Sequence, residues 1–182
     1  TPPDLMFAYM EKEAALLHRY HPKAQLWMSP QGFNSEWLQE FYQLLKRQPA
    51  WLTGIVYGPQ LGMSIAEFRS KIPARYLIRR YPDITHNYDS QYPVPDWDYA
   101  YAATENRESI NPRPREEAAI FRSADSKDYC GFITYSEGIN DDVNKMIWSG
   151  LGWNPNTPVT TILKEYSRYF IGPEYTNDFA LG

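Results

Sequence analysis

The chain has 182 residues, which is enough for one domain with a substantial buried core. Its formal net charge is −4, from 18 basic and 22 acidic residues, and this excludes the broad basic surface of a nucleic-acid-binding protein. The sequence contains no apolar run of about 18 residues, so we expect no membrane insertion. No signal peptide is visible either. The only cysteine, Cys130, excludes an intrachain disulfide, and we expect it to be buried at the start of a strand.

Aromatic residues are the unusual part of the composition, at 16% of the chain. Two interpretations stay open. The rings can simply fill the core, because aromatic side chains bury large apolar areas. Alternatively, some of them line a cleft in which flat apolar ligands such as sugars stack against the ring faces.

The first half of the chain alternates helices and strands. Tyr9, Leu16 and Tyr20 lie at roughly helical spacing from Leu5, and His21 precedes a proline that ends this first helix. Turn residues mark the boundaries that follow, and the N-cap candidates are Asn34 or Ser35 for the second helix and Ser64 for the third. The pattern predicts helices over residues 1–20, 34–45 and 64–72, and strands over residues 25–28, 52–57 and 76–81.

The second half contains one further strand and ends in helices. A loop rich in Pro, Asp and Tyr runs over residues 82–95. Thr157 and Pro158 are typical of a helix start, and the Gly172-Pro173 pair is typical of a helix end. The pattern predicts helices over residues 96–107, 116–122, 140–151 and 157–170, and its clearest strand over residues 131–135.

Strands alternating with helices at this spacing predict an α/β fold with a parallel sheet. The predicted architecture is a partial TIM-type (β/α) barrel of about four parallel strands, ending in two helices. A complete eight-stranded barrel needs about 200 to 250 residues or more, so residues 1–182 are interpreted as a single-domain fragment with both termini truncated. A small open α/β sheet is the alternative, although the glycine-rich phosphate loop of such folds is missing.

Ligand-binding groups of a parallel α/β fold gather just beyond the carboxyl ends of the strands. Glu137 follows the clearest strand by two residues and is the first candidate for catalysis. Asp83 follows the third strand, and the two could form the acid and anion pair of glycoside cleavage. Glu137 could equally cap the next helix, whereas Asp141 and Asp142 are explained as favourable first-turn charges. The other polar candidates beyond the strand ends are Gln31, His86, Asn87, Asp89 and Asn140.

Two further sites are weaker hypotheses. Asp83, His86 and Asp89 could ligate a metal, but one His and two Asp in a loop form a weak pattern, and His86 is better explained as a structural hydrogen bonder. We therefore assign no metal and no cofactor. An arginine-rich segment could contact an anion such as a uronic-acid carboxylate, although pairing with neighbouring glutamates explains it as well. Its arginines are Arg107, Arg113, Arg115 and Arg122.

Several stretches together resemble the later strands of large bacterial (β/α)8-barrel glycoside hydrolases, of the hexosaminidase-like and α-glucuronidase-like kind. The stretches are residues 27–33, 83–89, 92–98, 135–138 and 148–172. It implies a carbohydrate ligand, the rest of the parent barrel as partner, and a periplasmic or secreted location. It also implies that aromatic residues near the strand ends form stacking walls: Trp27, Tyr57, Tyr81, Trp97 and Tyr135.

The leading functional hypothesis is therefore hydrolysis of an O-glycosyl bond in an oligo- or polysaccharide, a hexosaminide or a uronide, with this chain supplying part of the sugar cleft. In hexosaminidase-like barrels the catalytic pair follows the fourth strand. By that resemblance the pair would precede Thr1, and Asp83 and Glu137 would bind sugar hydroxyls instead. The rival hypothesis is a catalytically silent carbohydrate-binding or scaffold domain with a degenerate barrel.

Overall fold

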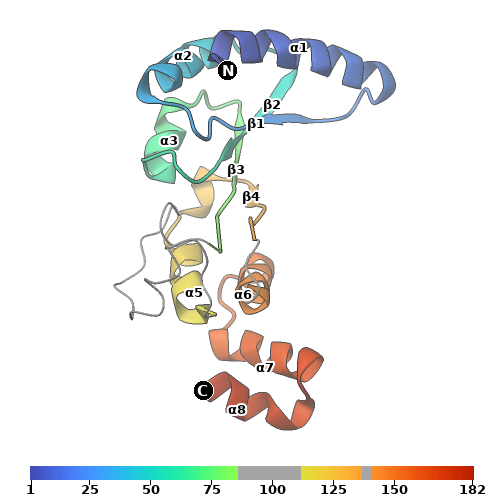
Figure 1. Ribbon diagram of the computed structural model, residues 1–182, viewed down its shortest axis with the longest axis vertical. Coiled ribbons are helices and arrows are strands. Elements are labelled where there is room, and N and C mark those ends of the chain that lie inside the picture. The colour runs from blue at the N-terminus through green and yellow to red at the C-terminus, as the bar shows by residue number, and fades with distance from the viewer. Residues whose placement is uncertain (86–111, 137–140) are drawn as a thin grey trace. The chain divides into compact units, whose positions relative to one another are not determined.

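The computed structural model describes residues 1–85, 112–136 and 141–182 (Figure 1). The chain is an α/β protein whose described residues contain seven α-helices and a four-stranded parallel sheet. It forms two compact units. Unit 1 comprises Thr1–Tyr81 and Ser126–Ile133, and unit 2 comprises the described residues of Pro82–Asp125 and Thr134–Gly182.

Unit 1 contains the sheet and the first three helices. Its elements in chain order are α1 (Pro3–Tyr20), β1 (Leu26–Met28), α2 (Ser35–Lys46), β2 (Leu52–Tyr57), α3 (Ile65–Lys71), β3 (Leu77–Arg80), the 3-10 helix η1 (Ser126–Asp128) and β4 (Gly131–Phe132). The strands lie in the order β1-β2-β3-β4, so each strand is next to its neighbour in sequence (Figure 1). The predicted order of strands and helices is confirmed here.

Capping side chains fix where two of these helices begin. The Asn34 carboxamide oxygen accepts a hydrogen bond from the Trp37 backbone N–H at 2.8 Å, at the start of α2. The Ser64 hydroxyl oxygen accepts one from the Glu67 N–H at 3.2 Å, at the start of α3. Both caps satisfy N–H groups that have no partner inside the helix. The Ser64 cap was predicted from the sequence, and Asn34 is one of the two predicted candidates for the start of α2.

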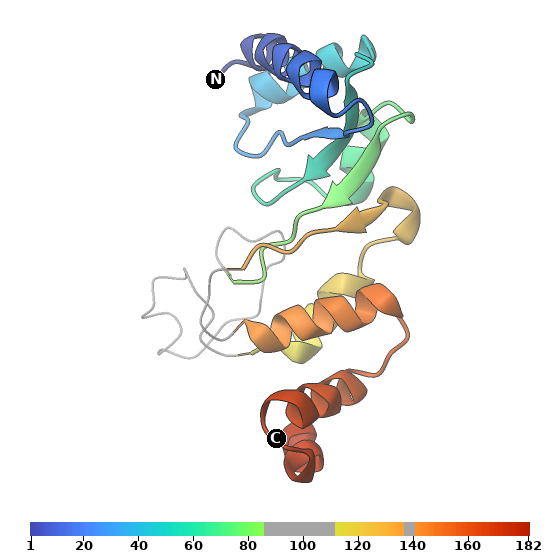
Figure 2. The same ribbon diagram turned by 90° about the vertical axis from the view of Figure 1, so that its right-hand side faces the viewer.

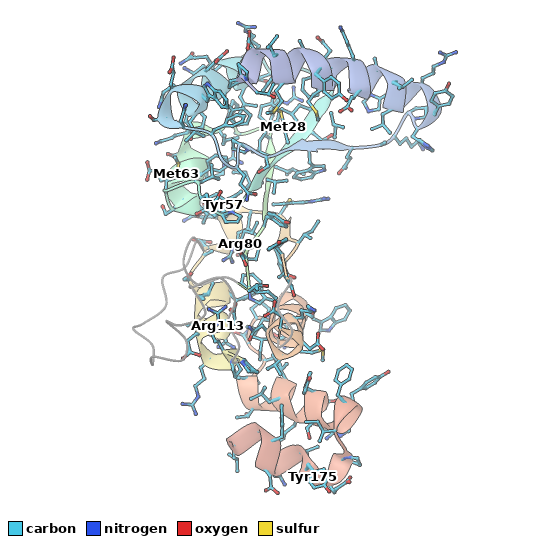
Figure 3. All side chains as sticks on the ribbon, viewed as in Figure 1. Met28, Tyr57, Met63, Arg80, Arg113 and Tyr175 are labelled. Carbon is cyan, nitrogen blue, oxygen red and sulfur yellow. The ribbon has the colours of Figure 1, made fainter. Side chains whose placement is uncertain are left out.

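The two faces of the sheet differ in burial. One face is buried by α2 and α3, because Phe68 of α3 packs on Tyr57 of β2 with ring centroids 5.6 Å apart and also meets Tyr42 of α2 at 6.5 Å. Figure 3 shows Tyr57 close to Met63, the residue that precedes the α3 cap. We call the opposite face, which carries Trp27, Val56, Leu77 and Arg79, the open face. Its side chains are partly exposed, and Leu77 is 48% exposed.

Helix α1 has the predicted length but packs through a different side from its most regular apolar stripe. Phe7 and Ala14 are buried, and the Phe7 ring meets Phe41 of α2 edge-on at 5.8 Å. The stripe that predicted the helix is exposed, at 59% for Leu5 and 61% for Tyr9. Spacing therefore predicted the helix correctly, but it did not identify which side faces the core.

Unit 2 contains the remaining helices: α5 (Pro114–Arg122), α6 (Asp142–Trp153), α7 (Val159–Phe170), the 3-10 helix η2 (Pro173–Tyr175) and α8 (Thr176–Leu181). Helices α7 and α8 lie side by side (Figures 1 and 2). The Trp148 ring of α6 is fully buried and meets Phe121 of α5 edge-on, with centroids 5.2 Å apart. Helix α8 was not predicted from the sequence.

Three local predictions are corrected by the structure. The strand expected over residues 131–135 is shorter, because β4 ends at Phe132 and only one further bridge joins Tyr135 to Asp83. Helix α7 begins after Pro158 without a side-chain cap, so Thr157 does not cap it. Cys130 is exposed rather than buried, although its backbone N–H donates to the Ile78 carbonyl oxygen of β3 at 2.8 Å.

Candidate functional site

A hollow on the open face of the sheet is the candidate binding site of unit 1. Its volume is about 280 Å³, and it lies toward the carboxyl ends of the strands. Three residues predicted to contact a sugar, namely Trp27, Gln31 and Tyr81, line this hollow together. The other lining residues are Ser29, Val56, Arg79, Arg80 and Ile133.

Trp27 is held in place by contacts from two neighbouring strands. A Cβ atom added to Gly54 would lie 2.3, 2.5 and 2.7 Å from three adjacent atoms of the six-membered ring. Because these distances are nearly equal, the ring lies flat over the glycine, and only a glycine leaves room for it. From β3, the Arg79 guanidinium carbon lies 3.9 Å from the ring centroid, within the range of a cation–π interaction.

Gln31 reaches from the loop after β1 to the end of β2. Its side-chain oxygen lies 2.9 Å from where a Cβ atom of Gly58 would be, so the absence of a side chain at Gly58 makes room for it. The Ser29 hydroxyl oxygen accepts a hydrogen bond from the Gln31 backbone N–H at 3.2 Å and so shapes this loop. The surface of the hollow is almost entirely apolar, although Ser29, Gln31 and Arg79 are among its lining residues.

The remaining predicted site residues that the structure describes, namely Tyr57, Asp83 and Tyr135, do not line this hollow. Tyr57 lies on the buried face of the sheet, where its hydroxyl donates to the Met63 carbonyl oxygen at 2.6 Å. Tyr135 belongs to unit 2 and pairs with Asp83. Glu137, His86, Asn87, Asp89, Trp97 and Asn140 lie outside the described residues, as do Arg107 and two of the three proposed metal ligands.

A cluster of polar side chains in unit 2 joins the loops that follow β3 and β4. The Asp83 carboxylate accepts a hydrogen bond from the Thr85 backbone N–H at 2.9 Å. The buried Asp141 carboxylate accepts from the Thr85 hydroxyl and, at 2.8 Å, from the Ser136 hydroxyl. Asp141 was interpreted as a favourable charge at the start of a helix, and it is the N-cap residue of α6; it makes no side-chain cap there, and its hydrogen bonds tie two loops together.

Arg113 and Glu117 form a buried ion pair at the start of α5. Their charged atoms lie 3.0 Å apart, and the side chains are 3% and 2% exposed. Arg113 also donates to the Ile84 carbonyl oxygen at 3.0 Å, and its backbone N–H donates to the Asn144 side chain of α6 at 2.9 Å. In Figure 3, Arg113 lies where α5 faces α6. Pairing with a glutamate, one of the two interpretations of this segment, is found for Arg113, whereas Arg122 donates to the backbone carbonyl oxygens of Pro155 and Thr157.

Glu117 also accepts a hydrogen bond at 2.7 Å from the indole N–H of Trp148. Burial raises the pKa of Glu117 to about 7, while the Arg113 charge and the Trp148 N–H lower it. A carboxyl with a pKa near neutrality resembles a general acid. However, a side chain that is 2% exposed cannot reach a substrate, so Glu117 holds α5 and α6 together.

Several residues that form the contacts described above were not selected as site residues from the sequence. Arg79 was not among the predicted site residues, and Glu117 is one of the neighbouring glutamates that were expected only to pair with an arginine. A glycine inside a strand, such as Gly54, is a usable signal, because it often marks a close approach by another group. Within the described residues, no group of three or more His, Cys, Asp or Glu side chains could hold a metal ion.

No helix in the described part of the chain is both long enough and apolar enough to span a membrane. No family model, curated protein or solved structure matches this chain. The resemblance to barrel glycoside hydrolases therefore stays a prediction from the sequence.

Proposed function

We propose that the chain is the later part of a (β/α)8-barrel glycoside hydrolase and supplies part of its sugar cleft. The hollow on the open face carries this proposal, because Trp27, Gln31 and Tyr81 line it together at the strand ends. Parallel α/β enzymes bind their ligands at this end of the sheet. An aromatic surface with a few polar groups around it suits a sugar ring, which has apolar faces and a rim of hydroxyl groups.

The order of the strands supports the barrel. Each strand pairs with its neighbour in sequence, in the order β1-β2-β3-β4 without a reversal. Doubly wound sheets reverse this order at the point where they bind ligands, whereas a barrel keeps it. Parallel sheets are normally covered on both faces, but the open face of this one is partly exposed. In a closed barrel that face would line the interior.

The proposed catalytic pair is Asp83 and Glu137. A parallel bridge joins Asp83 to Tyr135, and Glu137 follows Tyr135 by two residues in the sequence. One carboxyl would protonate the leaving oxygen and the other would act as the anion. If these residues only bind or support the sugar, the catalytic pair belongs to an earlier part of the parent protein.

A catalytically silent carbohydrate-binding domain is the second candidate. The observation that favours it is the Asp83 carboxylate, which accepts the Thr85 backbone N–H at 2.9 Å and so stabilises its own turn. An aspartate carboxylate that accepts the backbone N–H two residues further on commonly stabilises a turn, and this role needs no catalysis. This candidate keeps the sugar-binding hollow and omits the chemistry.

The test is turnover of a panel of chromogenic glycosides by the intact parent protein and by its Glu137→Gln and Asp83→Asn variants. Glu116→Gln is the control, because Glu116 is an exposed carboxylate of α5. A loss of about a hundredfold or more in either site variant supports its role in acid–base catalysis. Full activity in both variants places the catalytic pair elsewhere in the parent. Sugar binding without turnover favours the silent domain, and the absence of both refutes the proposal.

A further inference from the structure

We infer that helix α1 is a self-association surface, through which two copies of this chain pair with their α1 helices parallel. The inference goes beyond the proposed function and does not rest on it, because the described residues that line the hollow all lie outside α1. Two observations carry it. A line of apolar side chains is exposed along α1, and two opposite charges flank this line at its middle.

Helix α1 has two apolar sides, although a surface helix normally has one. The side that carries Phe7 and Ala14 is buried, and Phe7 packs on α2 (Figure 1). The other side is exposed, and we call it the α1 stripe. It consists of Leu5 at 59% exposure, Tyr9 at 61%, Leu16 at 59% and Tyr20 at 66%. With about 3.6 residues per turn, these positions lie within about 60° of the helix circumference and extend over about 22 Å, so they form one line. An exposed apolar patch of this kind marks a contact with another molecule.

Lys12 and Glu13 flank the α1 stripe at its middle, on opposite sides. Both side chains are exposed, and each lies about 50° from the centre line of the stripe. Neither residue has an oppositely charged residue three or four positions away in α1, so neither has a charged partner on its own helix. The Tyr9 hydroxyl hydrogen-bonds to Glu13, which raises the pKa of Tyr9, and the second carboxylate oxygen can still accept from a cation. The two charges can therefore pair with a second molecule.

The position of these charges selects a parallel pair of helices. When two α1 helices lie parallel with their stripes in contact, the side that carries Lys12 on one helix faces the side that carries Glu13 on the other. Because the two residues are adjacent in sequence, they lie at nearly the same height, and Lys12 of each copy meets Glu13 of the other. In an antiparallel pair, Lys12 would meet Lys12 and Glu13 would meet Glu13, and like charges across an interface oppose binding. Flanking charges of this kind set the partner and the orientation of paired helices.

The size of the α1 stripe predicts a reversible dimer. Tyr9 is 61% exposed and Tyr20 is 66% exposed; at about 200 Å² for each side chain, the two rings offer about 250 Å² of contact surface. Even with the two leucines added, this is less than the roughly 800 Å² per partner of a standard protein–protein interface. We therefore expect the dimer to dissociate on dilution.

The test is sedimentation velocity of the full chain at protein concentrations from about 5 to 500 µM, over which the mean mass should rise toward that of a dimer. Lys12→Glu and Glu13→Lys should each weaken the dimer about tenfold, because each change turns two attractive pairs into repulsive ones. The variant with both substitutions exchanges the charges and should recover the wild-type affinity. Glu11→Lys is the matched control, because it makes the same charge change at an exposed position on the far side of α1 from the stripe.

Leu16→Gln tests the apolar part of the interface and should also weaken the dimer. All of these positions are exposed, so circular dichroism should show that the variants fold as the wild type does. A chain that stays monomeric at every concentration overturns the inference. A dimer that neither single charge reversal weakens also overturns it, because an antiparallel pair or another surface then holds the two copies together. So does a dimer that both single changes weaken and that the double exchange does not restore.

Discussion

Glu117 makes the stability of the fold depend on pH in an unusual direction. Burial raises the pKa of this carboxyl from 4.5 to about 7, although Arg113 and Trp148 lower it. Between these two pH values the folded protein keeps a proton that the unfolded chain has lost. The free energy of unfolding should therefore fall as the pH rises from about 4.5 to 7 and stay level above that range.

The size of this effect follows from the same two values. At about 1.36 kcal/mol for each pKa unit, the change from 4.5 to about 7 costs roughly 3 kcal/mol of stability at neutral pH. Glu117→Gln removes the titration and keeps an oxygen that can accept the Trp148 N–H. We expect the variant to be close to the wild type in stability near pH 4.5 and more stable at pH 7.

Urea unfolding followed by circular dichroism, at pH values from 4.5 to 8, measures this difference. We subtract the free energy of unfolding of the variant from that of the wild type at each pH. The contributions of all carboxyl and histidine groups that both proteins share then cancel. Glu116→Gln, at an exposed position of the same helix, should leave the pH dependence unchanged. A stability difference that grows in favour of the wild type as the pH rises would refute the reasoning, because the Arg113 pair would then outweigh burial.

Two further substitutions test the contacts that shape each unit. Gly54→Ala places a methyl group 2.3 Å from the Trp27 ring. We expect the free energy of unfolding to fall by about 1–3 kcal/mol because of overpacking. A shift of the tryptophan fluorescence emission would report the displaced ring. Thr85→Val removes a hydroxyl that donates to the buried Asp141 carboxylate. Thermal unfolding should show that the free energy of unfolding falls by about 1–3 kcal/mol. An unchanged melting temperature would contradict a stabilising role for this hydrogen bond.

The order of elements was predictable because most strands and helices carry local signals. The strand over Leu52–Tyr57 has the predicted boundaries, and the caps at Asn34 and Ser64 begin their helices as expected. The side of α1 that packs was not predictable, because its exposed stripe, including Leu5 and Tyr9, has the more regular spacing. Burial depends on what the helix meets in space, and spacing alone does not contain that information.

The candidate site was predictable only in part, for a related reason. The rule that ligands bind at strand ends selected Trp27, Gln31 and Tyr81, which line one hollow. The same rule selected Tyr57, which points to the opposite face because successive strand residues alternate. Arg79 was overlooked because a charge inside a strand is expected to interrupt a buried sheet, whereas one face of this sheet is open.

The most direct test of the central claim is a crystal structure of the protein soaked with methyl glucoside. The account predicts a sugar in the hollow, with its ring contacted by Tyr81 and its hydroxyl groups near Gln31. A sugar bound at another surface, with the hollow empty, would contradict the account.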